Sequence, residues 1–243
     1  MILRPIFIST LQRALVEGWR MANATRGTSL AYALIFTLAG LAIIGTLLAQ
    51  GWAPFIIAAA GAFMLVGPAI LAGFFGIAAA HEAGEAAGFA AVSRGFATAA
   101  NALWALALVC GLLFMIFVTD AAILYAYMVG ATPVWLGELL PAGDGVARFV
   151  GWSAVSGAVV AFLLFCISAF AVPLLCERRA GLVGAVACSV KVVFGNFMVA
   201  MIWALLLSTV VIGSVLLLPL LPLTLPWLAY ASRALYREAL PLS

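Results

Sequence analysis

Charged residues are scarce in this chain. Its 243 residues include 11 Lys and Arg and 8 Asp and Glu, or 8% charged, whereas a soluble domain carries about a quarter charged residues. With 67% apolar residues and a mean hydropathy of +1.29, this scarcity excludes a soluble globular protein, a disordered chain and a nucleic-acid binder with a large basic surface. We therefore expect an integral membrane protein in the lipid bilayer, with no nucleic-acid partner.

The chain also lacks the residues of most catalytic and redox centres. It has one histidine, His81, and four cysteines without a C-x-x-C pair, so a haem-copper core is excluded. No Ser-His-Asp set, metal cluster or phosphate-binding glycine loop can be assembled. His81, Glu82 and Glu85 follow one another closely but lack further ligands nearby, and we interpret them as a solvated helix end. We expect no enzyme, no metal and no cofactor.

Long uncharged runs set the number of membrane crossings. Gly27–Ala80 holds 54 residues without a charge, about 81 Å as a helix against a hydrocarbon core of about 30 Å, so it must fold back once. We place that turn at Gln50–Pro54 and a second turn, in the 41-residue run Val192–Ser232, near Gly213-Ser214. The sequence thus predicts an all-α polytopic membrane protein, a single domain over residues 1–243. Its six spans are expected at 29–49, 55–79, 102–128, 149–175, 197–213 and 215–235.

The basic residues favour this count. With six spans, only Arg148 lies on one side and the other ten basic residues lie opposite. Five spans would give eight against three, so the positive-inside rule favours six, with both termini cytoplasmic. Residues 1–26 are expected to form a cytoplasmic interfacial amphipathic helix, because apolar residues recur at helical spacing opposite charged ones. The apolar positions are Ile8, Leu11, Leu15, Trp19 and Ala22, and the charged ones are Arg13, Glu17 and Arg20.

An amphipathic turn that leads to an asparagine and then to a span occurs three times, at residues 15–23, 92–101 and 189–196. The second span of each pair carries proline, which kinks a helix and frees a carbonyl. We therefore predict three kinked hairpins, built as an internal repeat in parallel and each introduced by a cytoplasmic-side helix. Chance similarity between apolar segments is the alternative. Asn23, Asn101 and Asn196 are expected to cap the helices that follow them.

The pattern also resembles a known family. The features are Gly18-Trp19-Arg20, the first span Leu30–Gly40, Leu65-Val-Gly-Pro68, Val172-Pro-Leu-Leu175 with Glu177-Arg178-Arg179, and a proline-rich last span that ends in Tyr236-Arg237. Together they resemble the bacterial six-span inner-membrane proteins known as domain of unknown function 2189. The resemblance covers about residues 10–238 and implies a multi-pass protein of the bacterial inner membrane. Members are sometimes labelled cytochrome oxidase subunit I, which implies at most a non-redox subunit here.

Asp120 is the one acid inside a long apolar run, and a carboxylate at that depth costs free energy unless it has a role. It would lie about 29 Å along a helix that starts near Asn101. It could bind a proton or cation, or pair with a partner's basic residue. Alternatively, it lies at the outer interface with its charge in water.

Two further groups are candidates for contacts. Ser153, Gly157 and Ala161 form a small-residue stripe, which would pack within the bundle or against a partner. Arg178, Arg179 and Lys191 could hold anionic lipid headgroups, or act only as an orientation signal. The external segment Gly130–Gly145 is a candidate docking element.

The sequence thus favours a non-catalytic accessory, assembly or stabilising subunit of a larger membrane complex, with a respiratory complex as one host, or a self-associating protein. A transporter or channel for a small solute, and a lipid-binding membrane protein, are the alternatives.

Overall fold

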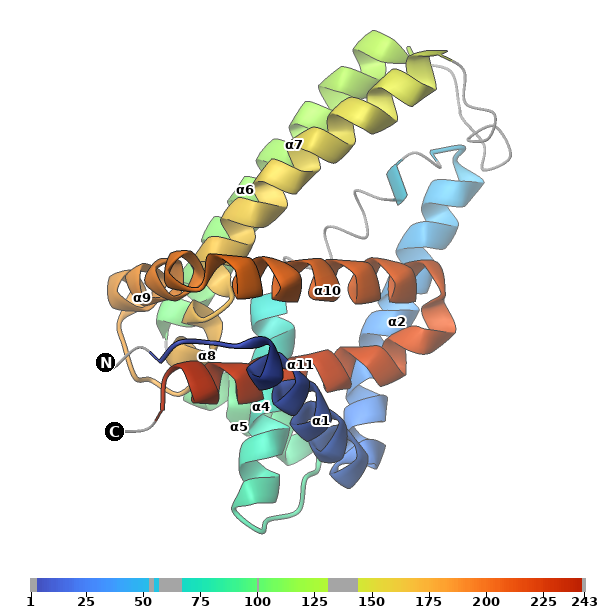
Figure 1. Cartoon of the computed structure of the whole chain (residues 1–243). Helices are drawn as coiled ribbons and strands as arrows, with labels where there is room; N and C mark the ends of the chain where they lie inside the picture. Colours follow the sequence, from blue (N-terminus) through green and yellow to red (C-terminus); the bar gives the residue numbers. More distant parts are fainter. Residues whose placement is uncertain (1–3, 53–54, 57–66, 100, 131–143, 242–243) are drawn as a thin grey trace.

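The computed structural model describes residues 4–52, 55–56, 67–99, 101–130 and 144–241. The all-α prediction is confirmed for this part of the chain, in which no β-sheet occurs (Figure 1). The helices are α1 (Ile8–Ala24), α2 (Arg26–Ala49), α4 (Gly67–Glu82), α5 (Phe89–Thr98), α6 (Asn101–Met128), α7 (Asp144–Ser168), α8 (Ala171–Cys176), α9 (Leu182–Gly195), α10 (Phe197–Leu216), the 3-10 turn η3 (Leu218–Leu220) and α11 (Leu221–Ala239).

Four described helices are long and apolar enough to cross a membrane: Arg26–Ala49, Asn101–Met128, Asp144–Cys176 and Phe197–Ser214. They coincide with the predicted spans 29–49, 102–128, 149–175 and 197–213. The predicted span 55–79 and its preceding turn fall partly outside the described residues. From residue 67 the span is helical, as part of the 16-residue α4, which continues to Glu82. The predicted span 215–235 is not among the four. Its place is taken by α11, which carries Arg233, Arg237 and Glu238 in its last two turns.

The turn predicted near Gly213-Ser214 is wrong, because α10 continues through both residues to Leu216. The helix stops at Leu217, whose φ of −110° and ψ of 67° are not helical. Pro219 favours a break here, since proline has no N–H to donate to the carbonyl four residues earlier, in the last turn of α10, and its ring clashes with that carbonyl. Most of the external segment Gly130–Gly145 proposed for docking, residues 131–143, lies outside the described residues.

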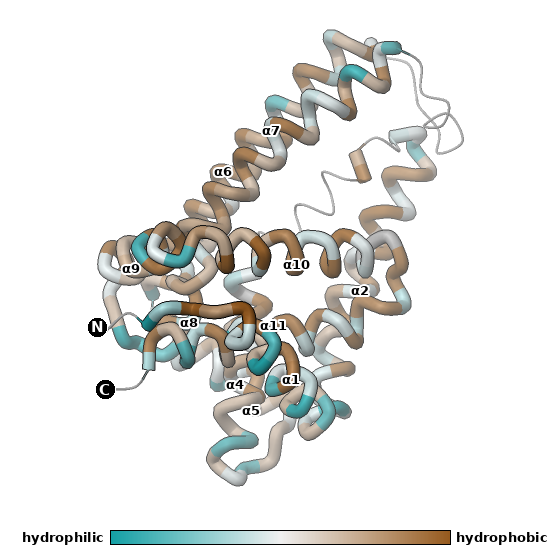
Figure 2. Tube along the Cα trace, viewed as in Figure 1, coloured by the Kyte–Doolittle hydropathy of each residue, from teal (hydrophilic) through white to brown (hydrophobic). Residues whose placement is uncertain are grey.

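The long hairpin α6–α7 projects from the other helices, and its two members lie side by side (Figure 1). Hydrophilic residues gather along α1, at the turn between α4 and α5 and near the chain ends, whereas most of α2 and α10 is hydrophobic (Figure 2). The polar parts of the sequence therefore collect away from the middle of the long helices.

The N-terminal helix α1 packs along the C-terminal helix α11. Gly18 makes this approach feasible, because a Cβ there would lie 2.8 Å from the Ala231 Cα. The Trp227 indole donates a hydrogen bond to the Leu15 carbonyl at 2.9 Å. The amphipathic helix expected within residues 1–26 therefore exists, but one of its faces covers α11. Four large apolar residues remain exposed: Phe7, which precedes the helix, and Ile8, Val16 and Trp19 within it.

A buried hydroxyl network joins α2 to α11. The Ser29 hydroxyl lies 2.7 Å from the Tyr230 hydroxyl and 2.8 Å from the Thr25 hydroxyl. The Tyr230 ring meets Phe74 of α4 edge to face, with centroids 5.7 Å apart. Because a buried polar group without a partner costs about 1–3 kcal/mol, these hydroxyls fix the relative positions of α2 and α11.

Helices α4 and α5 form a tight hairpin through small residues. A Cβ on Gly76 would collide with the Ala91 carbonyl oxygen, and one on Gly95 would collide with that of Ala72. The backbones of α4 and α5 therefore touch. Glu82 is the last residue of α4 and so lies at the turn of this hairpin.

The helix that runs through α7 and α8 is broken at Ala169-Phe170, and Ser189 of α9 fills the break. The Ser189 hydroxyl donates to the Cys166 carbonyl at 2.8 Å and accepts from the Phe170 N–H at 3.2 Å. In an unbroken helix these two backbone groups would bond to each other. Ser189 is fully buried, so its hydroxyl replaces the missing bond where water has no access.

Two of the three predicted asparagine caps, at Asn23 and Asn196, are wrong. Asn101 is the first residue of α6, and the residue before it lies outside the described residues. Asn23 lies in the last turn of α1, and Thr25 is the residue that precedes α2. Asn196 precedes α10 but makes no side-chain capping bond; instead, its amide oxygen accepts a hydrogen bond from the Ile6 N–H at 2.8 Å. The N-terminal segment lies beside the end of α9, so the Ile6 N–H takes the place of a backbone N–H of α10 as the donor to Asn196.

We predict that Ser189→Ala lowers the free energy of unfolding by about 1–3 kcal/mol, because two buried backbone groups lose their partner. Thermal unfolding in detergent, followed by tryptophan fluorescence, measures the change. Ser93→Ala is the matched control, since the exposed Ser93 bonds only to the Ala90 carbonyl. Equal shifts in the two variants would contradict the bridging role of Ser189.

Candidate functional site

A cluster of charged side chains joins the ends of α4, α8 and α11. Arg233 of α11 is 6% exposed, and its two terminal nitrogens donate to the Glu82 carboxylate at 2.6 and 3.0 Å. Arg237, one turn later on the same helix face, donates to the same carboxylate at 2.9 and 3.2 Å. Glu82 is therefore bound by two guanidinium groups.

Glu177, just after α8, extends the cluster. It accepts hydrogen bonds from the Tyr236 hydroxyl at 3.0 Å and from Arg237 Nε at 3.4 Å. Arg233 Nε is buried without a hydrogen-bond partner in the described part of the chain, and Glu177 Oε1 lies 4.0 Å from it. A small cavity of about 80 Å³ adjoins the cluster. Its lining is Glu17, Met21, Glu82, Tyr230, Arg233, Ala234 and Arg237.

Paired charges, rather than reactive groups, characterise this cluster. Burial raises the pKa of Glu82, but the hydrogen bonds and charges of Arg233 and Arg237 outweigh it, so the net pKa of Glu82 is lowered. The Glu82 carboxylate, which accepts from both guanidinium groups, therefore stays ionised at neutral pH. In the described part of the chain, no three His, Cys, Asp or Glu residues lie close enough to hold a metal ion. The cluster ties three helix ends together.

Sequence reasoning missed this cluster. Glu82 was expected to be a solvated end, and Arg233 and Arg237 only indicated orientation. The one signal available was the spacing of Arg233, Tyr236 and Arg237, which places three polar side chains on one face of a helix. Glu82 and Arg233 lie 151 residues apart, so their pairing is not visible in the local pattern.

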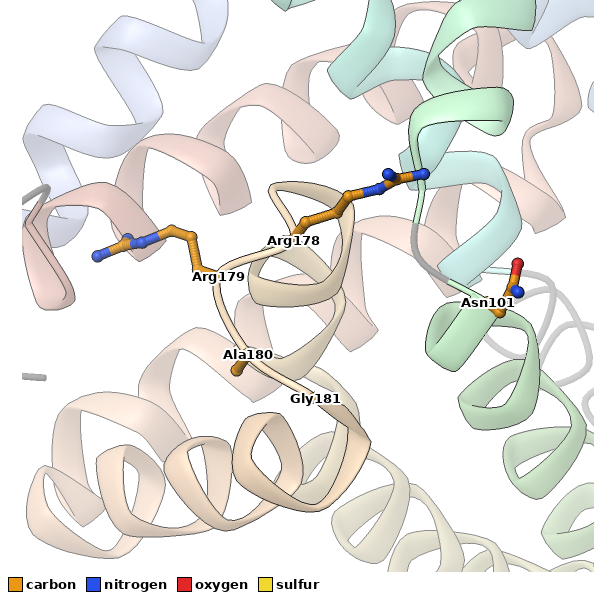
Figure 3. Close-up of a pocket in the computed structure, with 5 residues that line it drawn as sticks. All are labelled: Asn101, Arg178, Arg179, Ala180 and Gly181. Carbon is orange, nitrogen blue, oxygen red and sulfur yellow. The ribbon is translucent and has the colours of Figure 1, made fainter.

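Arg178 and Arg179 each bind the C-terminal end of another helix, and they point in opposite directions (Figure 3). Arg178 Nε donates to the Thr98 carbonyl at the end of α5 at 2.6 Å. Arg179 donates to the Leu240 and Pro241 carbonyls, after α11, at 2.8 and 2.9 Å. A cation at a helix C-terminus satisfies free carbonyls and opposes the negative end of the helix dipole.

Arg178 has a φ of 52°, a left-handed conformation that favours glycine. Its N–H donates to the Leu175 carbonyl and that of Arg179 to the Leu174 carbonyl, the pattern that closes a helix with a left-handed residue. Lys191, predicted to act with the two arginines, lies exposed on α9 and has no ion-pair partner among the described residues.

Beside these arginines the surface is hollowed by a cavity of about 540 Å³. It is lined by Asn101, Arg178, Arg179, Ala180 and Gly181 (Figure 3).

Asp120 is half-buried in α6 and accepts a hydrogen bond from the Ser156 hydroxyl of α7 at 2.7 Å. Beyond it, Tyr125 and Phe149 pack edge to face and both contact Phe55. An aromatic group of this kind is typical of a membrane interface. Five residues of helix span about 7.5 Å, so Asp120 and Tyr125 are separated by about 7.5 Å along the axis of α6.

The predicted small-residue stripe lies on α7, and its central residue, Gly157, faces α6. A Cβ on Gly157 would lie 3.3 Å from the Phe117 ring, so the glycine accommodates that ring within the chain. Ser153 and Ala161 are half-buried on the same helix, and the Ser153 hydroxyl has no hydrogen-bond partner among the described residues.

Comparison with known proteins gives one match. A family model described as "Predicted integral membrane protein (DUF2189)" matches residues 55–177, just over half of the chain. The matched segment contains α4 to α8, with Glu82, Asp120 and Glu177, whereas Arg233 and Arg237 lie outside it. No curated protein and no solved structure matches the chain.

We predict that Glu82→Gln lowers the free energy of unfolding by about 1–2 kcal/mol at neutral pH, because buried Arg233 loses its carboxylate. The pH dependence has a definite sign. Since the pKa of Glu82 is lower in the folded chain than its ordinary value of 4.5, its contribution is complete above that pH and is lost on further acidification. The parent should therefore lose stability more steeply below pH 4.5 than Glu82→Gln.

Glu85→Gln is the matched control. Glu85 pairs with Arg94, and both side chains are about half exposed, so its loss should change stability by no more than about 0.5 kcal/mol. Thermal unfolding between pH 3.5 and 7 in detergent measures all three proteins, with these limits chosen to bracket the ordinary carboxyl pKa of about 4.3. Parallel acid profiles for the parent and Glu82→Gln would contradict the assignment.

Proposed function

The chain belongs to the DUF2189 family of predicted integral membrane proteins, and on this premise we propose that it is a non-catalytic accessory, assembly or stabilising subunit of a larger membrane complex. A respiratory complex of the bacterial inner membrane is a suitable host. The observation that carries the proposal is the surface of the α6–α7 hairpin.

The hairpin presents large apolar side chains along its length. On α7 these include Trp152, Val155, Val159 and Leu163. The stripe around Gly157 is occupied by Phe117 of the same hairpin, so the opposite side of α7 is free to meet lipid or another protein. A two-helix arm that projects from the rest of the chain offers a long face for a partner helix (Figure 1).

The same proposal includes six spans with both termini cytoplasmic. In it, the segment ending in α4 forms the second crossing and α11 the sixth. Contacts between the two ends of the chain support a common side: the Arg4 N–H donates to the Ala239 carbonyl at 3.1 Å, and Arg13 pairs with Glu238 at 2.7 Å. Concentration of the basic residues at these ends agrees with the positive-inside rule.

We predict that the chain purified from its native membrane in a gentle detergent co-migrates with a larger partner, and that Val155→Trp abolishes this. A bulky ring on a protein-facing position disturbs close packing, whereas lipid chains adapt to it. Met198→Trp, at a 74% exposed position on α10, is the matched control and should keep the partner. Isolation of the parent chain alone would overturn the proposal.

Transport of a small solute is the second candidate, and the observation that favours it is Asp120. This carboxylate is half-buried in an otherwise apolar helix and accepts a hydrogen bond from Ser156. Insertion of a carboxylate into a membrane is unfavourable, so its presence there is typical of a proton or cation route.

For that candidate, Asp120→Asn should lower solute or proton flux in proteoliposomes at least about tenfold, because the exchangeable charge is lost. Ser156→Ala, which removes the hydrogen bond and keeps the charge, should have a smaller effect. Unchanged flux in Asp120→Asn would contradict a transport role for this carboxylate.

A further inference from the structure

The cavity of about 540 Å³ lies where two apolar segments end. Asn101 is the first residue of α6, and Arg178–Gly181 closely follow Cys176, the last residue of the Asp144–Cys176 segment. Because a spanning helix ends where the hydrocarbon ends, a cavity between two such ends lies at the depth of the lipid headgroups. Its volume is within the range of about 300–1,000 Å³ that small-molecule sites occupy.

The lining offers hydrogen-bond donors and positive charge. Arg178 Nε and one terminal nitrogen donate to the Thr98 and Ala97 carbonyls, while its other terminal nitrogen has no partner among the described residues. The Ala180 and Gly181 N–H groups and the Asn101 amide are also without partners there. Among the described residues, no acid lines the cavity. Glu177, the nearest acid along the chain, is bonded to Tyr236 and Arg237.

The start of α9 reinforces the Arg178 charge. Gly181 precedes this 14-residue helix and makes no side-chain cap, so the N–H groups of the first turn carry unpaired partial positive charge. A guanidinium group beside free backbone N–H donors is a combination that binds phosphate.

An apolar track leads from the cavity along α6. Trp104 and Leu108 are three and seven residues after Asn101, which places them on the same helix face, and they are 43% and 76% exposed. A phosphate bound at Asn101 would therefore have an apolar surface beside it in the direction of the hydrocarbon. This continuity favours a lipid over inorganic phosphate, which has no apolar part.

We propose that this cavity binds the phosphate of an anionic phospholipid from the adjoining leaflet, with an acyl chain along Trp104 and Leu108. Arg178 provides the ion pair, and Asn101, Ala180 and Gly181 provide neutral donors. Arg179 contributes backbone only, since its side chain points away (Figure 3) and binds the end of α11. Lys191 does not line the cavity.

Two substitutions test the site. Asn101→Asp carries little risk to the fold, whereas Arg178→Gly also removes the bonds of Arg178 to the Thr98 and Ala97 carbonyls. Asn101→Asp places a carboxylate in the cavity without removing a protein contact, and an acid is favourable in the first turn of α6. Arg178→Gly removes the guanidinium group and suits the left-handed backbone at that position better than arginine does. Lys191→Ala is the matched control, because it removes one positive charge from the same surface outside the cavity.

The experiment is native mass spectrometry of the full-length chain released from nanodiscs that contain equal amounts of phosphatidylglycerol and phosphatidylcholine. The parent and Lys191→Ala should retain phosphatidylglycerol preferentially, and Asn101→Asp and Arg178→Gly should retain about tenfold less, because each disturbs a charge-assisted contact. Thermal unfolding of each variant identifies any that fails to fold.

Three outcomes would overturn the proposal. They are equal retention in the parent and both cavity variants, an equal loss in Lys191→Ala, and displacement of phosphatidylglycerol by inorganic phosphate as effectively as by added phosphatidylglycerol. The last would assign the cavity to a free anion.

Discussion

Backbone groups at helix ends need protein partners in this molecule, because the hydrocarbon of a bilayer offers no hydrogen bonds. The structure meets this constraint with long-range side chains. The Ser189 hydroxyl bridges the broken helix between α7 and α8, Arg178 binds the end of α5, and Arg179 binds the end of α11. Each contact satisfies backbone groups and also positions one helix against another.

The same constraint applies to the few charges. Arg233 is buried in α11, and its cost of desolvation is offset only by the geometry of its bonds to Glu82 and by Arg237 beside it. As a result α11, the least apolar of the long C-terminal helices, lies at the centre of the charged cluster and also contacts α1, α2 and α4. The chain ends are thereby fixed to the middle of the sequence.

Much of the helical framework could be predicted from local patterns. Uncharged runs indicated the helices that became α2, α6 and the α7–α8 segment, because run length and hydropathy are properties of consecutive residues. The turn after α10 lies a few residues beyond the predicted Gly213-Ser214, because the helix passes through the glycine and stops just before Pro219. The predicted cap at Asn196 is also wrong, because its side-chain oxygen accepts from the Ile6 N–H, 190 residues away in the sequence.

For this protein, the sequence by itself determined that the chain is helical and is an integral membrane protein, since composition alone decides whether lipid or water is the favourable solvent. It also indicated Asp120 as the one acid within a long apolar run and Arg178 as a candidate headgroup contact. Only the tertiary structure decided that Glu82 pairs with Arg233, that Arg178 and Arg179 point apart, and that a cavity opens beside Asn101. These features depend on how helices distant in sequence pack, and that arrangement follows from the sum of many contacts rather than from any local pattern.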